Sequence, residues 1–185
     1  DGFVFDDGTI SRLGKTHYLV TTTTANSEAV WRWMNRLLQL EWSTLDVQIT
    51  RVTDKYASLA IAGPNARPLL AKIAPGFDCE KDNFPFASVR EGRLGQKIAC
   101  RVYSVSYSGE QSFEINVPAR NAPWLYKKVI DEGVDYGLTP YGLETLDVLR
   151  IEKGHLSVGA EIDGRTIPYD LGLGRMVSKR KNFIG

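Results

Sequence analysis

Cysteine is scarce in this chain, and strong net charge is absent. The 185 residues include only Cys79 and Cys100, which lie far apart without metal-ligand spacing. We therefore expect reduced, partly buried thiols of a cytoplasmic protein and no disulfide framework. The formal net charge is +1, which favours neither nucleic acid nor a strongly charged surface as a partner.

Long apolar segments and common enzyme motifs are also missing. No apolar run approaches the length of a membrane-spanning helix, and no signal peptide opens the sequence, so we expect no membrane partner. The chain has no G-x-G-x-x-G after a strand, Walker loop, H-E-x-x-H or cluster of cysteine and histidine. His17 and His155 have no nucleophile placed beside them by the sequence. We therefore expect no metal site, and a function carried by carboxylates and aromatic side chains.

The stretch 105–118 carries the clearest pattern. Its apolar and polar residues alternate, which predicts two strands joined by a short turn at Ser108 and Gly109. In the second strand Phe113, Ile115 and Val117 share one face. Glu114 lies on the other face, so its carboxylate projects either into water or into a pocket lined with hydrogen-bond donors.

The rest of the sequence predicts strands grouped with helices and not strictly alternating with them. This grouping favours an α+β fold with antiparallel sheets, and split β-α-β (ferredoxin-like) units are the simplest fit. The expected strands are 3–5, 10–13, 17–24, 47–53, 56–61, 88–90, 97–107 and 112–117. The expected helices begin at 26 or 27, 63, 122 and 139, and end near 40, 73, 131 and 153.

The length suits one domain or two small ones. The sequence begins and ends abruptly, so we expect a fragment of a longer polypeptide. We divide it into residues 1–54, the C-terminal part of a first subdomain, and residues 55–185, a second α+β subdomain with the segment that follows it.

Three motifs occur in order along the chain. They are Gly2-Phe3-Val4-Phe5-Asp6-Asp7, Tyr107-Ser108-Gly109-Glu110 with Phe113-Glu114-Ile115, and Leu149-Arg150-Ile151-Glu152-Lys153-Gly154. These motifs resemble the aminomethyltransferase family, which includes the glycine-cleavage T-protein and the folate domains of dimethylglycine- and sarcosine-oxidising enzymes. The resemblance covers nearly the whole chain. With residues 152–154, residues 170–174 and 176–179 make the chain most similar to the folate domain of the heterotetrameric sarcosine oxidase alpha subunit.

The resemblance implies a tetrahydrofolate site. Glu114 matches the family's pterin-binding glutamate, and Tyr107 matches an aromatic residue of the same site. Asp6 matches the catalytic carboxylate near the reactive folate amines, although its neighbour Asp7 leaves this match open by one position. From the residues alone, Asp6 also suits a hairpin turn, Glu114 a solvated strand and Tyr107 core packing.

The function that the resemblance implies is acceptance of the one-carbon unit from sarcosine demethylation, giving 5,10-methylenetetrahydrofolate. Flavin and NAD are expected only in absent parts of the full oxidoreductase, so the fragment alone should be inactive. The partners implied are folate, a small amine-derived one-carbon unit and the other subunits of a hetero-oligomeric oxidase.

One departure separates this chain from T-proteins. Where they carry an arginine ahead of Asp147, this chain has Leu146. An aminomethyltransferase or dimethylglycine dehydrogenase folate domain, and a non-catalytic subunit-contact module, remain the alternatives. Asp147 and Arg150 are three residues apart and can pair on one helix face, which by itself is no evidence of a site.

Overall fold

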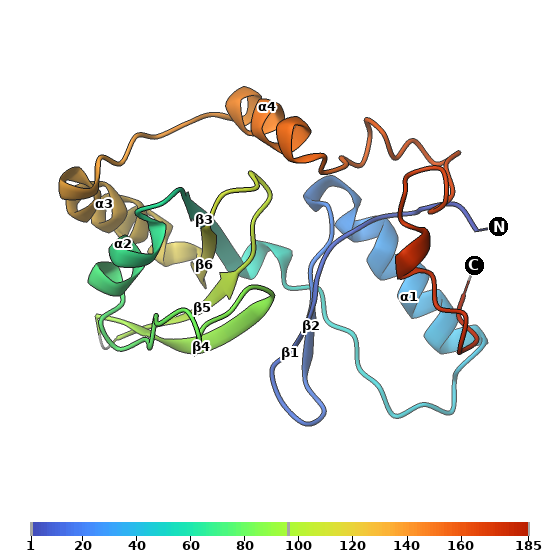
Figure 1. Ribbon diagram of the computed structural model, residues 1–185. Coiled ribbons are helices and arrows are strands. Elements are labelled where there is room, and N and C mark those ends of the chain that lie inside the picture. Colours follow the sequence, from blue (N-terminus) through green and yellow to red (C-terminus); the bar gives the residue numbers. More distant parts are fainter. Residues whose placement is uncertain (1, 96, 185) are drawn as a thin grey trace. The chain divides into compact units, whose positions relative to one another are not determined.

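A computed structural model describes residues 2–95 and 97–184 and groups the chain into two units (Figure 1). One unit is Val52–His155. The other combines the residues up to Arg51 with those from Leu156 onward. Asp1 and Gly185, the first and last residues of the sequence, lie outside the described residues. Each unit is described below by itself.

The Val52–His155 unit is built on a four-stranded sheet in the order β3-β6-β5-β4, in which all neighbours are antiparallel. Because β3 and β5 both run antiparallel to β6, which lies between them, they are parallel to each other. The crossover from β3 to β5 contains α2 and β4, so the unit holds a split β-α-β arrangement. Its elements are β3 (Tyr56–Ala62), α2 (Ala66–Ile73), β4 (Ser88–Leu94), β5 (Ile98–Ser104), β6 (Ser112–Pro118), α3 (Ala122–Gly133) and α4 (Leu143–Lys153).

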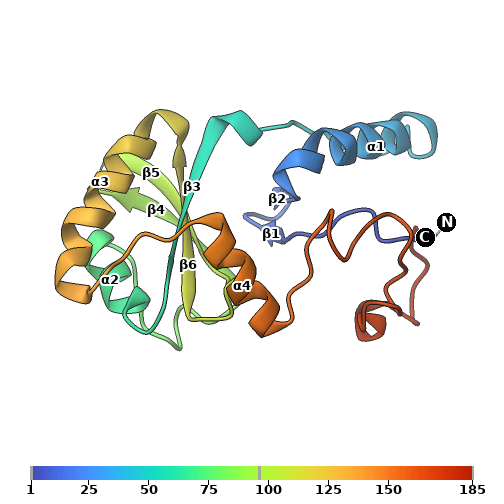
Figure 2. The same ribbon diagram turned by 90° about the horizontal axis from the view of Figure 1, so that it is seen from above.

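The hydrophobic core lies between one face of this sheet and the helices α2 and α3, which Figure 2 shows on the same side of the strands. The predicted alternation of β6 is confirmed, because Phe113, Ile115 and Val117 are fully buried in this core. The rings of Phe113 and Phe84 stack with their centroids 5.6 Å apart. The helices contribute Leu69, Leu70, Ile73, Leu125 and Val129.

Both cysteines are free and buried, as expected for structural thiols. Burial raises the pKa of Cys100 to about 11 and also raises the pKa of Cys79. These thiols are therefore protonated and weakly nucleophilic near neutral pH.

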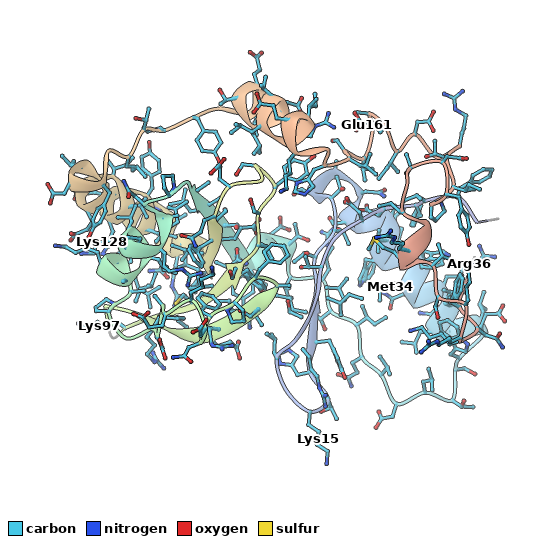
Figure 3. The ribbon with its side chains drawn as sticks, in the orientation of Figure 1. Lys15, Met34, Arg36, Lys97, Lys128 and Glu161 are labelled. Carbon is cyan, nitrogen blue, oxygen red and sulfur yellow. The ribbon has the colours of Figure 1, made fainter. Side chains whose placement is uncertain are left out.

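The other unit holds the hairpin of β1 (Ile10–Arg12) and β2 (Tyr18–Val20), and the helix α1 (Ser27–Leu40). Figure 3 shows Lys15 at the tip of this hairpin. The helical spacing of Val30, Trp33 and Leu37 correctly predicts α1. No residue of α1 is fully buried.

The segment from Leu156 onward contacts the N-terminal residues directly, since the Val4 N–H donates to the carbonyl of Thr166 at 2.9 Å. This segment contains one short 3₁₀ turn, Gly174–Met176. The division into subdomains 1–54 and 55–185 stays a prediction.

Several predicted element bounds are wrong. Residues 3–5 and 47–52 form no strand, and Thr53–Lys55 is a 3₁₀ turn. The last helix begins at Leu143 and not at Thr139, because residues 139–142 are not helical and Gly142 has an extended backbone. β5 ends at Ser104, so residues 105–111 form a loop and not a strand with a tight turn. The α+β class with antiparallel sheets is confirmed.

Candidate functional site

Glu114 lies in the middle of β6, on the face of the sheet opposite to α2 and α3. Its register partners are Ala60 on β3 and Tyr103 on β5. Directly opposite residues of antiparallel strands project to the same face, with their Cβ atoms about 5 Å apart. Glu114 is half-buried. The prediction that it faces away from the core is therefore correct, but its carboxylate is not simply solvated.

The Glu114 carboxylate is half-buried and has no donor from the protein. Within residues 2–95 and 97–184, no side chain or backbone N–H forms a hydrogen bond or ion pair with it. Burial alone raises the pKa of Glu114. A partly desolvated carboxylate without protein donors is unfavourable, so this position suits a ligand that presents N–H groups to it.

Tyr103, the cross-strand neighbour of Glu114, belongs to none of the motifs and is not among the predicted site residues. Its side chain is buried and its hydroxyl forms no hydrogen bond of good geometry with the part of the chain that the structure describes. Burial raises the pKa of Tyr103; Asn116 and Arg101 partly oppose the rise, whereas the charges of Glu91 and Glu114 add to it. Only the strand register could have shown that Tyr103 and Glu114 are neighbours.

Tyr107 lies in the loop after β5 and is 36% exposed, so the core-packing alternative is wrong. Its ring stacks on the His155 ring with centroids 5.8 Å apart and an interplanar angle of 17°. The Tyr107 carbonyl oxygen lies 2.9 Å from His155 Nδ1. Tyr107 and Glu114 belong to the same unit: Tyr107 lies in the connection between β5 and β6, and Glu114 lies in β6, the strand that follows.

Asp6 belongs to the other unit, where its carboxylate is held by three hydrogen bonds. Oδ1 accepts from the backbone N–H groups of Asp7 at 2.7 Å and Thr23 at 3.0 Å, and Oδ2 accepts from the Asn26 amide at 2.7 Å. These bonds fix the orientation of the Asp6 carboxylate.

The adjacent Asp7 differs from Asp6 electrostatically. Partial burial, followed by the charge of Asp6, raises the pKa of Asp7. Two neighbouring carboxylates thus have different environments, and both stay candidates for a role in proton transfer.

Arg150 is buried, with only 5% of its surface exposed; its spacing from Asp147 indicates that the two can pair but not that Arg150 is buried. Its Nε donates to Asp147 Oδ1 at 2.9 Å, and its Nη1 donates to the His155 carbonyl at 3.1 Å. The Asp147 carboxylate is largely exposed. The pair therefore fixes the C-terminal end of α4 and is more than a surface ion pair.

No cluster of three or more His, Cys, Asp or Glu side chains that could hold a metal ion occurs in residues 2–95 and 97–184. Over the same residues, no helix is both long and apolar enough to cross a membrane.

Comparison with known families tests whether the chain belongs to the family that its motifs resemble. The GCVT N-terminal domain family matches residues 1–181. The chain belongs to this family. The match includes Asp6, Tyr107 and Glu114, so all three predicted site residues lie inside the family's domain.

Curated relatives of two kinds cover the whole chain. Sarcosine oxidase alpha subunits of Rhizobium meliloti (strain 1021) and Corynebacterium sp. (strain U-96) are 43% and 40% identical over 187 and 185 residues, with 19% of each relative covered. An aminomethyltransferase of Caldanaerobacter subterraneus subsp. tengcongensis is 34% identical over 186 residues, with 48% covered. The chain thus spans about a fifth or about half of these relatives.

A solved structure has the same fold. The glycine cleavage system aminomethyltransferase T from Bartonella henselae superposes with a TM-score of 0.78 over 96% of this chain and 45% of that one, at 24% identity. The predicted resemblance to the aminomethyltransferase fold is confirmed.

Proposed function

We propose that this chain is the folate-binding region of a sarcosine oxidase alpha subunit. In the whole enzyme it would accept the one-carbon unit released by sarcosine demethylation, and the product would be 5,10-methylenetetrahydrofolate. The higher identity to sarcosine oxidase alpha subunits than to the aminomethyltransferase supports this assignment. Leu146, in the position where T-proteins carry arginine, agrees with it.

The observation that carries the proposal is the uncompensated carboxylate of Glu114. The pterin edge of tetrahydrofolate presents a ring N–H beside an amino group, a fork that one carboxylate accepts with both oxygens. Glu114 has both oxygens available and a pKa raised by burial. Binding such a fork would supply the donors that the described residues do not. The need of Glu114 for hydrogen-bond donors therefore fits tetrahydrofolate.

Tyr107 and the aspartates would have different roles. Tyr107 presents a partly exposed aromatic ring, which suits contact with a flat heterocycle. The Asp6 carboxylate, fixed by its hydrogen bonds, would hold or move a proton near the amines that tetrahydrofolate contributes as one-carbon acceptor. Flavin and NAD would bind elsewhere in the full enzyme, together with the other subunits.

The aminomethyltransferase reaction is the second candidate. An aminomethyltransferase matches the whole chain, and such an enzyme would use the same folate-binding carboxylate. Sarcosine-dependent formation of methylenetetrahydrofolate by the parent enzyme would favour the first candidate.

The test of the folate site is a calorimetric titration of the full parent chain with a stable reduced folate. Glu114→Ala should abolish measurable binding while the chain stays folded. Glu110→Ala is the matched control, because Glu110 is an exposed carboxylate in the loop before β6. Equal affinity in the Glu114→Ala and wild-type chains would disprove the assignment.

A second test separates the two aspartates. Asp6→Asn should spare folate binding but slow methylene transfer in the whole enzyme, because it removes the acceptor for a proton. Asp7→Asn should have the smaller effect on transfer. An unchanged rate in Asp6→Asn, with a slow rate in Asp7→Asn, would move the role to Asp7.

A further inference from the structure

The loop between β5 and β6, residues 105–111, lies against the C-terminal end of α4; we refer to it as the Tyr107 loop. Besides the Tyr107–His155 ring stack, Gly109 is close to the Lys153 side chain. A Cβ added to Gly109 would lie 2.8 Å from Lys153 Cγ. Inside the loop, Ser106 Oγ accepts from the Gly109 N–H at 3.0 Å. The loop that carries Tyr107 is therefore supported from outside the sheet.

The hydrogen bond between His155 and the loop has a defined direction. A carbonyl oxygen can only accept, so the Nδ1 atom that lies 2.9 Å from the Tyr107 oxygen must carry a proton. A neutral His155 ring is consequently the Nδ1–H tautomer, with Nε2 as an acceptor. The ring thus contacts Tyr107 twice, through its face and through one N–H.

His155 is itself fixed by α4. Its backbone N–H donates to the Arg150 carbonyl at 2.8 Å, and its carbonyl accepts from Arg150 Nη1 at 3.1 Å. Gly154, with φ of +82°, turns the chain at this point so that both bonds can form. Because Arg150 is buried, His155 is held by a rigid group and not by a mobile surface side chain.

We propose that His155 is a positioning residue that holds the Tyr107 loop in the geometry needed to bind the ring system of a reduced folate. The proposal rests on the folate-binding function proposed above. His155 acts through Tyr107: the ring stack orients the tyrosine side chain, and the Nδ1–H bond fixes its backbone. Arg150 in turn holds His155. No contact between His155 and the ligand is required.

The test uses the full parent chain and two variants that separate the ring stack from the Nδ1–H hydrogen bond. His155→Phe keeps a ring for stacking and removes the donor, whereas His155→Asn keeps a side-chain N–H and removes the ring. His17→Phe is the matched control, because His17 is the other histidine of the chain and belongs to the other unit.

Two readouts are expected to move together. Without folate, amide hydrogen exchange in residues 105–111 should accelerate in His155→Phe at unchanged global stability. The dissociation constant for a reduced folate should rise roughly 2- to 10-fold, as expected for one lost hydrogen bond. His155→Asn should recover part of both effects, and His17→Phe should change neither.

A third readout does not depend on folate. In the wild-type chain at about pH 9, where histidine side chains are ordinarily neutral, ¹⁵N NMR should show His155 as the Nδ1–H tautomer. The Nε2–H tautomer, or unchanged loop exchange in His155→Phe, would overturn the proposal.

If the wild-type chain binds no folate, the proposed function fails, but the hydrogen-exchange rate of the loop and the His155 tautomer still decide whether His155 holds the loop. If Glu114→Ala loses binding and His155→Phe does not weaken it, the function stands and the positioning role is wrong.

Discussion

At the scale of single residues, the environment of Glu114 links stability to its proposed function. A carboxylate whose pKa is raised by burial costs the folded state free energy once it is ionised. A half-buried carboxylate without protein donors does not favour the folded state, so stability alone does not account for Glu114. The cost is understandable if a ligand supplies the missing hydrogen bonds.

Glu114→Gln should therefore be more stable than wild type near neutral pH. Because the raised pKa means that the folded state binds the proton more tightly, the wild type loses stability relative to the variant as pH rises through that pKa. At pH values below the ordinary pKa of glutamate this pH-dependent part of the difference should be absent. Denaturant unfolding between acidic and neutral pH checks this, and an unchanged difference across the range would contradict it.

Gly109→Ala should destabilise the chain. Gly109 has φ of +87°, a conformation that costs other residues about 1–3 kcal/mol, and its new Cβ would lie 2.9 Å from Lys153 Cβ. Gly142→Ala is the control, because Gly142 has a negative φ and open space around its Cα. Equal unfolding midpoints for the two variants would show that the Tyr107 loop can move away from α4.

At the scale of elements, predictions succeed where local pattern and burial agree. The strand β6 and the helices α1 and α3 were predicted closely, because their apolar spacing matches the surface that each one packs. The strand expected at 47–53 is absent although its residues alternate. Alternation shows only that a segment could form a strand, and this segment has no neighbouring strand to pair with among the described residues.

The candidate residues show the same limit of local sequence patterns, which do not specify how elements pack. The motifs propose Asp6, Tyr107 and Glu114 as candidate residues, and alternation predicts the face of Glu114. The contacts of Tyr107 with His155 and of Glu114 with Tyr103 were not found, because they join residues 48 positions apart or depend on register. Such contacts are decided by how elements pack, which local sequence does not specify.

Arg150→Met should weaken the end of α4. The variant keeps an apolar stem but removes the donors to Asp147 and to the His155 carbonyl, so we expect a loss of about 1–3 kcal/mol in the free energy of unfolding. Lys127→Met removes a well-exposed pair with Asp131 and should cost less than about 1 kcal/mol. Denaturant unfolding of both variants measures the contrast, and equal losses would mean that the burial of Arg150 adds nothing.

At the scale of the whole molecule, the two units differ in how much apolar surface they bury. Among the residues that the structure describes, all buried hydrophobic side chains except Ile162 belong to the unit Val52–His155. A polypeptide of residues 52–155 should therefore fold alone, with a cooperative denaturant transition and dispersed amide NMR signals. Residues 1–51 alone should show neither. A 52–155 polypeptide without dispersed signals would mean that its core depends on the rest of the chain.

The central claim is that Glu114 binds reduced folate as an ionised carboxylate. The most direct test is to titrate the full parent chain and its Glu114→Gln variant with a stable reduced folate from near neutral pH down to about pH 4.5, the ordinary range of glutamate. Because both chains experience the same titration of the ligand, the difference between them reports Glu114. The account predicts that wild type binds more tightly near neutral pH, and that the advantage disappears as Glu114 takes up its proton. Equal affinity of the two chains at every pH would contradict it.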